Sequence, residues 1–325
     1  METLRGAEDT ERGAAPGSNA PRAGGSLTTR QKWWLGGAIA LFVLGLFGRG
    51  LLASESGDGF LAEWLPWLQG TDVTLYFGDP SGDYLVPVSR TLSGDDENVD
   101  ALADALLAGP TEATGLQSLV PPETAVRSIA VDEDVVTVDL SGAFWRDPPP
   151  LAAHALVHTL GSWPDVESVR VTVDGDAQDL GTGRLLFFYD APQDMLVATP
   201  TDAATARDVL VEYLSGPGTP RLAGLPQDVE VLQFESSPGS GLIKLNLRYT
   251  DSLRTLATDD GDGMRRILEG LIATLTTGAP DTSFVYLDFE GHATLGLGQC
   301  ANLLRRVQPP PPVLNDERLL DGVTG

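Results

Sequence analysis

Short apolar runs along residues 71–180 alternate with polar, turn-rich stretches, which is the pattern of a small domain built from strands and helices. Most runs are short and β-type, whereas Glu97–Ala108 repeats its apolar residues at helical intervals and stops at Gly109-Pro110. The predicted elements are, in chain order, Val73–Phe77, Tyr84–Val88, Glu97–Ala108, Arg127–Val131, Val135–Leu140, Leu151–Leu160 and Ser168–Val173. Their order is β-β-α-β-β-α-β.

The same order returns in residues 181–293, where the first helix again stops at a Gly-Pro pair, Gly216-Pro217. The predicted elements of this second unit are Arg184–Tyr189, Asp194–Ala198, Ala204–Leu214, Val229–Phe234, Leu242–Leu247, Met264–Leu275 and Ser283–Phe289. Corresponding points lie 107 residues apart at the Gly-Pro pairs and 116 apart at Pro164 and Pro280. Because the order is kept while the loops differ in length, we interpret the chain as a duplication of one domain.

The expected fold class is α+β, with two tandem small domains at residues 71–180 and 181–293 after an N-terminal transmembrane helix. Each domain should form a mostly antiparallel sheet with two helices. Each has enough strands and helices to bury a core of its own.

The membrane segment is predicted at residues 33–53, because Trp33–Leu52 is apolar apart from Arg49 and is long enough to cross a bilayer. Arg30 and Lys32 precede it and acidic residues follow it. The positive-inside rule then makes residues 1–32 a disordered cytoplasmic tail and places the body outside the cell membrane as a single-pass protein.

A cleaved signal peptide is the alternative interpretation, with Leu51-Leu52-Ala53 as a loose cleavage site. The bulky Leu51 and the long polar stretch before the span favour a retained anchor. In both cases the body is exported. A linker at residues 54–70 then leads into the first domain.

The C-terminal residues 294–325 read as a proline-rich tail. The prolines at 309–312 predict an extended spacer, and a polar tail of this kind is most often disordered.

Charge is the most unusual feature of the composition, since 46 Asp and Glu face 21 Lys and Arg and give a net charge of −25. Residues 1–53 are slightly basic, so the exported body carries the whole acidic excess. An acidic body repels polyphosphate, and a nucleic-acid partner is therefore excluded. A solubility or salt adaptation explains the same acidity.

Two histidines, His154 and His158, lie four apart on the predicted helix Leu151–Leu160, the spacing with which zinc proteases hold their metal. Residue 155 is alanine where such enzymes carry a glutamate base, and the remaining histidine, His292, lies in the other unit. We therefore favour a helix surface or an inter-domain contact over a zinc site.

Other candidates for chemistry are weaker. The acidic stretch Asp259–Gly263 has the wrong spacing for a calcium loop and favours a turn that caps the next helix, and Asp132-Glu133-Asp134 favours a hairpin turn. The single cysteine, Cys300, forms no intrachain disulfide and lies beyond both domains. We expect no catalytic, cofactor-binding or metal-binding residue, no cofactor, and no enzymatic activity.

The joint order of these motifs resembles the GerMN domain family, named from the spore germination protein GerM, in two tandem copies. The motifs that carry the resemblance are Val73–Phe77, Leu107–Pro110, Leu119–Pro122, Val136–Ser141 with Phe144, and Val166–Gly175. The second unit is more divergent but keeps Gly216-Pro217 and Glu290-Gly291. The family's founder is a lipoprotein, whereas here a transmembrane helix is expected in that place.

The resemblance implies a non-enzymatic envelope module of the kind found in sporulation and germination proteins. Our first hypothesis is a scaffold that binds envelope proteins, such as a transenvelope complex. The alternatives are an accessory module that binds peptidoglycan or a small ligand, and an envelope protein associated with a sensor kinase.

Overall fold

The computed structural model of the chain describes residues 70–92, 98–146, 151–180, 183–277, 279, 282–290 and 297–320. The predicted tail at 1–32, the predicted span at 33–53 and all but the last residue of the linker lie outside these residues. Among the described helices, none is both long and apolar enough to cross a membrane.

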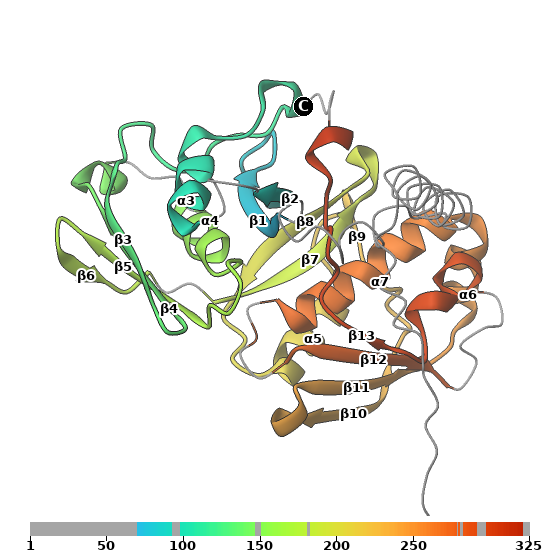
Figure 1. The fold of residues 1–325 in the computed structure, drawn as a ribbon. Coiled ribbons are helices and arrows are strands. Elements are labelled where there is room, and N and C mark those ends of the chain that lie inside the picture. Colours follow the sequence, from blue (N-terminus) through green and yellow to red (C-terminus); the bar gives the residue numbers. More distant parts are fainter. Residues whose placement is uncertain are drawn as a thin grey trace, which may run out of the picture. The chain divides into compact units, whose positions relative to one another are not determined.

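The predicted strands and helices occur in the predicted order in both repeats (Figure 1). The first repeat contains β1 (Thr71–Gly78), β2 (Leu85–Leu92), α3 (Val99–Ala108), β3 (Val126–Asp132), β4 (Val135–Leu140), α4 (Ala152–Leu160), β5 (Ser168–Val173) and β6 (Asp176–Gln178). The second contains β7 (Arg184–Asp190), β8 (Met195–Thr201), α5 (Ala206–Leu214), β9 (Leu222–Ala223), β10 (Val231–Ser237), β11 (Leu242–Leu247), α6 (Asp251–Asp259), α7 (Gly261–Thr276) and β12 (Phe284–Phe289). β13 (Val307–Gln308) follows them. The structure thus adds elements that were not predicted, β6 in the first repeat and β9 and α6 in the second.

The described strands form three sheets, whose strand orders are β1-β2-β8-β7-β9, β3-β4-β5-β6 and β10-β11-β12-β13. Pairing is mostly antiparallel, and the exceptions among the sheet pairs are β4 with β5 and β11 with β12, which run parallel. The α+β class is therefore confirmed. The expectation of one sheet per domain differs from what the structure shows, because the opening hairpins of the two repeats join in one sheet.

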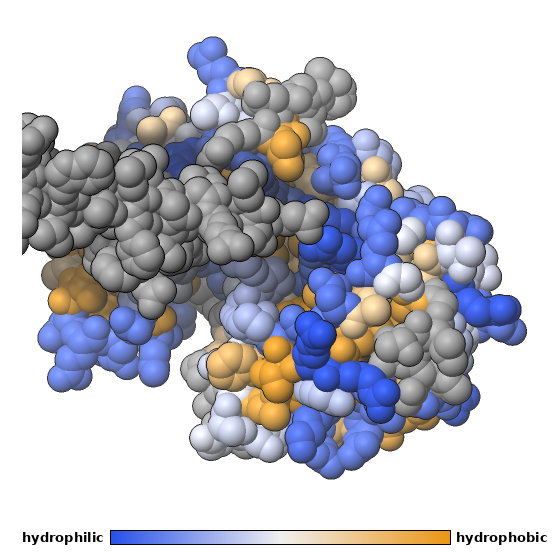
Figure 2. Space-filling view, turned by 45° about the vertical axis from the view of Figure 1, so that its right-hand side comes forward, coloured by the Kyte–Doolittle hydropathy of each residue, from blue (hydrophilic) through white to orange (hydrophobic). Residues whose placement is uncertain are grey.

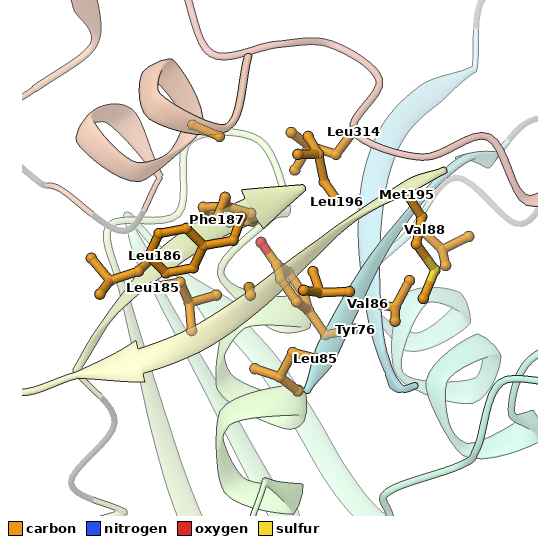
Figure 3. Packing of buried hydrophobic residues seen from close by; sticks show 14 of the residues in the cluster. Tyr76, Leu85, Val86, Val88, Leu185, Leu186, Phe187, Met195, Leu196 and Leu314 are labelled. Atoms are coloured by element: carbon orange, nitrogen blue, oxygen red, sulfur yellow. The ribbon is translucent and has the colours of Figure 1, made fainter. Parts of the chain in front are cut away.

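The pattern of burial explains why these hairpins meet. In β7 all six residues from Leu185 to Asp190 are buried, and Leu85–Val88 of β2 are buried in the same unbroken way. A strand that is buried on both faces has a continuous apolar run in its sequence. β2 and β7 have such runs and must therefore pack against other elements on both faces. Residues of both repeats thus enter one buried apolar cluster, part of which is drawn in Figure 3.

The two four-stranded sheets have a different pattern, because one face of each is open to solvent. In β4, the buried residues Val136, Val138 and Leu140 alternate with partly exposed ones. β11 in the second repeat follows the same two-residue period. Such alternation is typical of a strand that packs on the core through one face only.

Helices α4 and α7 contact β1 and β7, the first strand of each repeat, at equivalent points. The backbone N–H of Tyr76 in β1 donates to the hydroxyl of Thr159 in α4 at 3.0 Å. The N–H of Phe187 in β7 donates to the hydroxyl of Thr274 in α7 at 2.8 Å. Each repeat therefore uses a buried threonine of its last helix to satisfy a strand edge that has no neighbouring strand at that point.

The C-terminal segment, defined here as residues 297–320, differs most from expectation. β13 pairs with β12, and Leu297, Cys300, Leu304, Leu314 and Leu320 are buried. The prediction of a disordered tail is wrong for these residues. A chain that returns to the core after a proline run needs apolar anchors, and the leucines of this segment provide them.

Asn315 fixes this segment between the two repeats. Strands β2 and β8 pair only at Leu85 and Ala198, and the next pair along, Pro87 and Leu196, is separated by the Asn315 carboxamide. Its Nδ2 donates to the carbonyls of Pro87 (2.7 Å) and Leu196 (2.8 Å), while its Oδ1 accepts from Leu196 N–H (2.8 Å). Because proline has no N–H to donate, the side-chain amide supplies the hydrogen bonds that the strand pair lacks.

Candidate functional site

A groove of about 900 Å³ lies between the two repeats. One wall is formed by β1 and by the end of α4 with the residues that follow it, up to the start of β5. The other wall is formed by the end of α7 and the loop that leads to β12, and Pro310 and Pro311 of the C-terminal segment complete the lining. The same helix-to-strand connection of each repeat thus faces the other across the groove.

Hydrogen bonds hold the first wall in place. Ser162, one turn beyond α4, accepts from the N–H of Thr74 at 3.0 Å and donates to the carbonyl of the same residue at 3.1 Å. The backbone N–H of Glu167 donates to the carbonyl of Asp134 at 2.8 Å. The connection between α4 and β5 is therefore fixed to both sheets of the first repeat, so the side chains that it presents have defined positions.

His154 and His158 lie side by side on α4, with nearly parallel rings whose centroids are 6.1 Å apart. His158 lines the groove, its ring lies 5.7 Å from that of Tyr76, and the backbone of Gly183 at the start of the second repeat contacts it. The interpretation as an inter-domain contact is thus confirmed for His158. Nε2 of His158 and Nδ1 of His154 are buried without a hydrogen-bond partner among the described residues.

Burial controls the protonation of His158. Desolvation, with a smaller contribution from the neighbouring His154, lowers the pKa of His158 to about 4, although the Gly183 backbone acts in the opposite direction. The imidazole is therefore neutral at pH 7 and adds no positive charge to the groove.

The structure does not gather a metal-binding group from these histidines. Among the described residues, no set of three or more His, Cys, Asp or Glu side chains is placed to hold a metal ion. His292 lies outside the described residues.

The acidic stretch Asp259–Gly263 behaves as predicted. Asp259 ends α6 and Gly261–Gly263 begin α7, and the carboxylate of Asp260 between them accepts from the N–H of Gly263 at 2.8 Å and so caps α7. The turn at Asp132-Glu133-Asp134 joins β3 to β4 as expected, with Glu133 at a φ of 55°. The first stretch is a helix junction with an N-cap and the second is a hairpin turn, so the role that the structure shows for each is structural.

Cys300 is buried in the C-terminal segment against α7, and burial raises the pKa of its thiol to about 11. The thiol is protonated at neutral pH and is therefore a poor nucleophile.

A buried ion-pair cluster was missed by the sequence analysis. Asp79 directly follows the first strand of the first repeat and Asp190 ends that of the second; neither has exposed surface, and both bind Arg221. The guanidinium lies 3.1 Å from Asp79 and 2.6 Å from Asp190, over the ring of Tyr84. An aspartate at the same place in both repeats was the sequence signal that pointed to it.

Hydrogen bonds keep Asp79 ionised despite its burial. Burial alone would raise its pKa, but hydrogen bonds from the Ser81 hydroxyl and the Tyr84 N–H, with the charge of Arg221, bring the pKa below its ordinary value. Oδ1 of Asp190 is buried with no hydrogen-bond partner among the described residues. The cluster thus ties the first repeat to a loop of the second without offering an open site.

The fold and the groove define a tandem α+β module in which two copies of one unit share a sheet. Residues 74–179 match the family described as Germane: Sporulation and spore germination. A comparison with curated proteins finds no match.

Among solved structures, the tandem GerMN domains of the sporulation protein GerM from Bacillus subtilis match with a TM-score of 0.52 and 15% identity. That match covers 76% of this chain and 99% of the other. The first GerMN domain of the same protein matches with a TM-score of 0.29 and 19% identity, over 33% of this chain and 86% of the other. A putative lipoprotein from Clostridium perfringens gives 0.23 and 18%, over 34% and 78%.

The tandem match agrees with the duplication seen in the sequence, while the family match covers the first repeat. The chain therefore carries two tandem domains of GerMN-like fold, and the first of them matches the family model for sporulation and spore germination.

Proposed function

We propose that this chain is a non-enzymatic scaffold of the bacterial cell envelope, held at the outer face of the membrane by Trp33–Leu52 and binding other envelope proteins through its tandem repeats. The observation that carries the proposal is the shared five-stranded sheet, with Asn315 inserted at its seam. Hydrogen bonds across that seam hold two related surfaces in one orientation. A scaffold needs this property and a flexible pair of domains lacks it.

The surface supports the same role. Hydrophilic residues cover most of the described surface on the face drawn in Figure 2, and hydrophobic residues form small groups among them. A net charge of −25 keeps such a body soluble and repels nucleic acid. It favours partners with basic surfaces, because complementary charge speeds encounter.

The likeness to the tandem domains of a sporulation protein supports an envelope setting. We propose that the chain acts in sporulation or germination, or in a related envelope process. In this setting the body lies outside the membrane and residues 1–32 lie in the cytoplasm.

Crosslinking in intact cells tests the proposal. The full chain, expressed from its own locus, is crosslinked and its partners are identified by mass spectrometry. The Asn315→Ala variant, which weakens the seam, is compared with Asn302→Ala, a change at an exposed side chain of the same segment. We expect defined envelope partners for the wild type and Asn302→Ala, and fewer crosslinks for Asn315→Ala.

Two results would contradict the proposed scaffold function. One is the absence of any crosslinked partner together with normal envelope assembly after deletion of the gene. The other is metal-dependent hydrolysis by the purified chain that is lost on His158→Ala, which would make the chain an enzyme.

A further inference from the structure

The groove between the repeats has a negative electrostatic character that begins with its helices. Both α4 and α7 end at the groove, where Gly161 and Ser162 follow one helix and Thr276 and Thr277 end the other. The C-terminal end of a helix carries partial negative charge from the aligned peptide dipoles. Because the two helices come from equivalent places in the repeats, their negative ends meet in one cavity.

Carboxylates add to the negative electrostatic potential of the groove. Asp165 and Glu167 lie on the first wall and are exposed, and no ion pair joins either of them to a described residue. The described residues that line the groove include no lysine or arginine. His158 is neutral at pH 7 and does not offset the carboxylates. The groove therefore repels anions and attracts cations.

The remaining lining suits an organic cation better than a metal ion. The hydroxyls of Thr74, Ser162, Thr282 and Ser283 offer neutral acceptors along the walls, while the rings of Pro310 and Pro311 provide an apolar strip. A long aliphatic stem that ends in a charged group matches such a strip beside acidic residues. A metal ion would need several carboxylates around one point, and the described residues form no such group.

We propose that this groove binds a lysine- or arginine-containing peptide segment of a partner protein. The charged end group lies at the helix ends near Asp165 and Glu167, and the stem lies along Pro310 and Pro311. The cavity volume of about 900 Å³ is at the upper end of the range of about 300–1,000 Å³ found for ligand sites, so it accepts a short segment. The inference rests on the proposed scaffold function and names the chemistry that the scaffold recognises.

Peptide binding to the purified full chain tests the inference. The probe is a fluorescent peptide of sequence Lys-Val-Lys-Val-Lys, with Glu-Val-Glu-Val-Glu as its anionic counterpart, and binding is followed by anisotropy at moderate salt. The groove variant carries Asp165→Asn and Glu167→Gln. The matched control carries Asp104→Asn and Glu112→Gln, which remove the same charge from two exposed residues away from the groove.

We expect the wild type to bind the lysine peptide and not the glutamate peptide. The groove variant should bind it about five- to tenfold more weakly, since two exposed ion pairs with the peptide are lost, and the control by less than about twofold. Equal loss in the two variants means that the overall charge of the chain attracts the peptide, and this overturns the groove as the site. Binding of a soluble muropeptide in place of the lysine peptide also overturns it.

Crosslinking in cells separates this inference from the scaffold function. If the groove variant keeps every partner that the wild type crosslinks, the scaffold stands and the groove inference fails. If the wild type crosslinks no partner, the scaffold itself fails. Selective loss of one partner in the groove variant, but not in the control, supports both.

Discussion

At the scale of single residues, Asn315 replaces a peptide group that the sheet lacks. Pro87 interrupts the pairing of β2 with β8, and the carboxamide of Asn315 inserts there with three hydrogen bonds to the two strands. Arg266 donates a further bond to its Oδ1 at 2.8 Å. One side chain from the C-terminal segment thus connects the two repeats.

We predict that Asn315→Ala destabilises the fold by about 2–4 kcal/mol, because it leaves the buried N–H of Leu196 and two carbonyls without partners. Urea unfolding of the full chain followed by circular dichroism measures the change. Asn302→Ala, at an exposed side chain, should change stability by less than about 0.5 kcal/mol. A loss as small as that of the control would show that water replaces the carboxamide without cost.

The role of Asn315 could not be predicted from the sequence, for a physical reason. Asn315 stands in a polar stretch after four prolines, and its role depends on a strand more than two hundred residues away. A proline within the apolar run of β2 was the local sign that a hydrogen bond was missing there. By contrast, the capping role of Asp260 was predictable, because a cap acts on its own helix.

His158 gives a prediction for pH dependence. Its pKa is about 4 in the folded chain and about 6.5 when unfolded, so between these values the unfolded state binds more protons. Stability is therefore lost as pH falls from about 6.5 toward 4, by up to about 3 kcal/mol from this residue. His158→Phe should remove that part of the decline, as measured by urea unfolding at pH 7 and pH 5. If the variant and the wild type decline in parallel, the imidazole is solvated and the prediction fails.

At the scale of elements, α4 and α7 cover equivalent edges of β1 and β7 in the shared sheet. Thr159 of α4 and Thr274 of α7 are buried and accept from strand N–H groups at equivalent positions. α7 also approaches β7 closely, since a Cβ added at Gly270 would lie 2.7 Å from the carbonyl oxygen of Phe187. Duplication has thus kept the helix-to-edge contact in both repeats.

We predict that Thr159→Val and Thr274→Val each cost about 1–3 kcal/mol, because valine keeps the shape but leaves a buried strand N–H unpaired. Thermal unfolding of the two variants measures the cost. Thr258→Val, at an exposed position on α6, is the matched control and should be nearly neutral. A cost confined to one of the two threonines would contradict the equivalence of the repeats.

Elements were the best-predicted level of the structure. β4 and β5 match the predicted Val135–Leu140 and Ser168–Val173, because alternating burial leaves a two-residue period in the sequence. The assembly of β1, β2, β7 and β8 into one sheet was not predicted. Their apolar runs show that both faces are buried, but a run cannot show which strand lies beside it.

At the scale of the whole molecule, the two repeats are joined by the shared sheet and by contacts across it. β2 of the first repeat lies next to β8 of the second, Arg221 of the second binds Asp79 of the first, and the C-terminal segment contacts both. Glu317 in that segment also forms a bidentate pair with Arg90 of β2. A substitution that destabilises one repeat should therefore also lower the stability of the other.

Leu287→Ala tests this coupling. Leu287 is fully buried in β12, outside the shared sheet, and its truncation should cost about 2–5 kcal/mol. If the repeats unfold together, the slowest-exchanging amides of β1 and β2 in the first repeat speed up by the same factor as those of β7, in hydrogen exchange followed by mass spectrometry. Lys244→Ala, at an exposed position on the neighbouring strand β11, should leave all of these rates unchanged. Faster exchange confined to residues 183–290 would mean that the repeats unfold separately, and a scaffold of fixed orientation would then lose its physical basis.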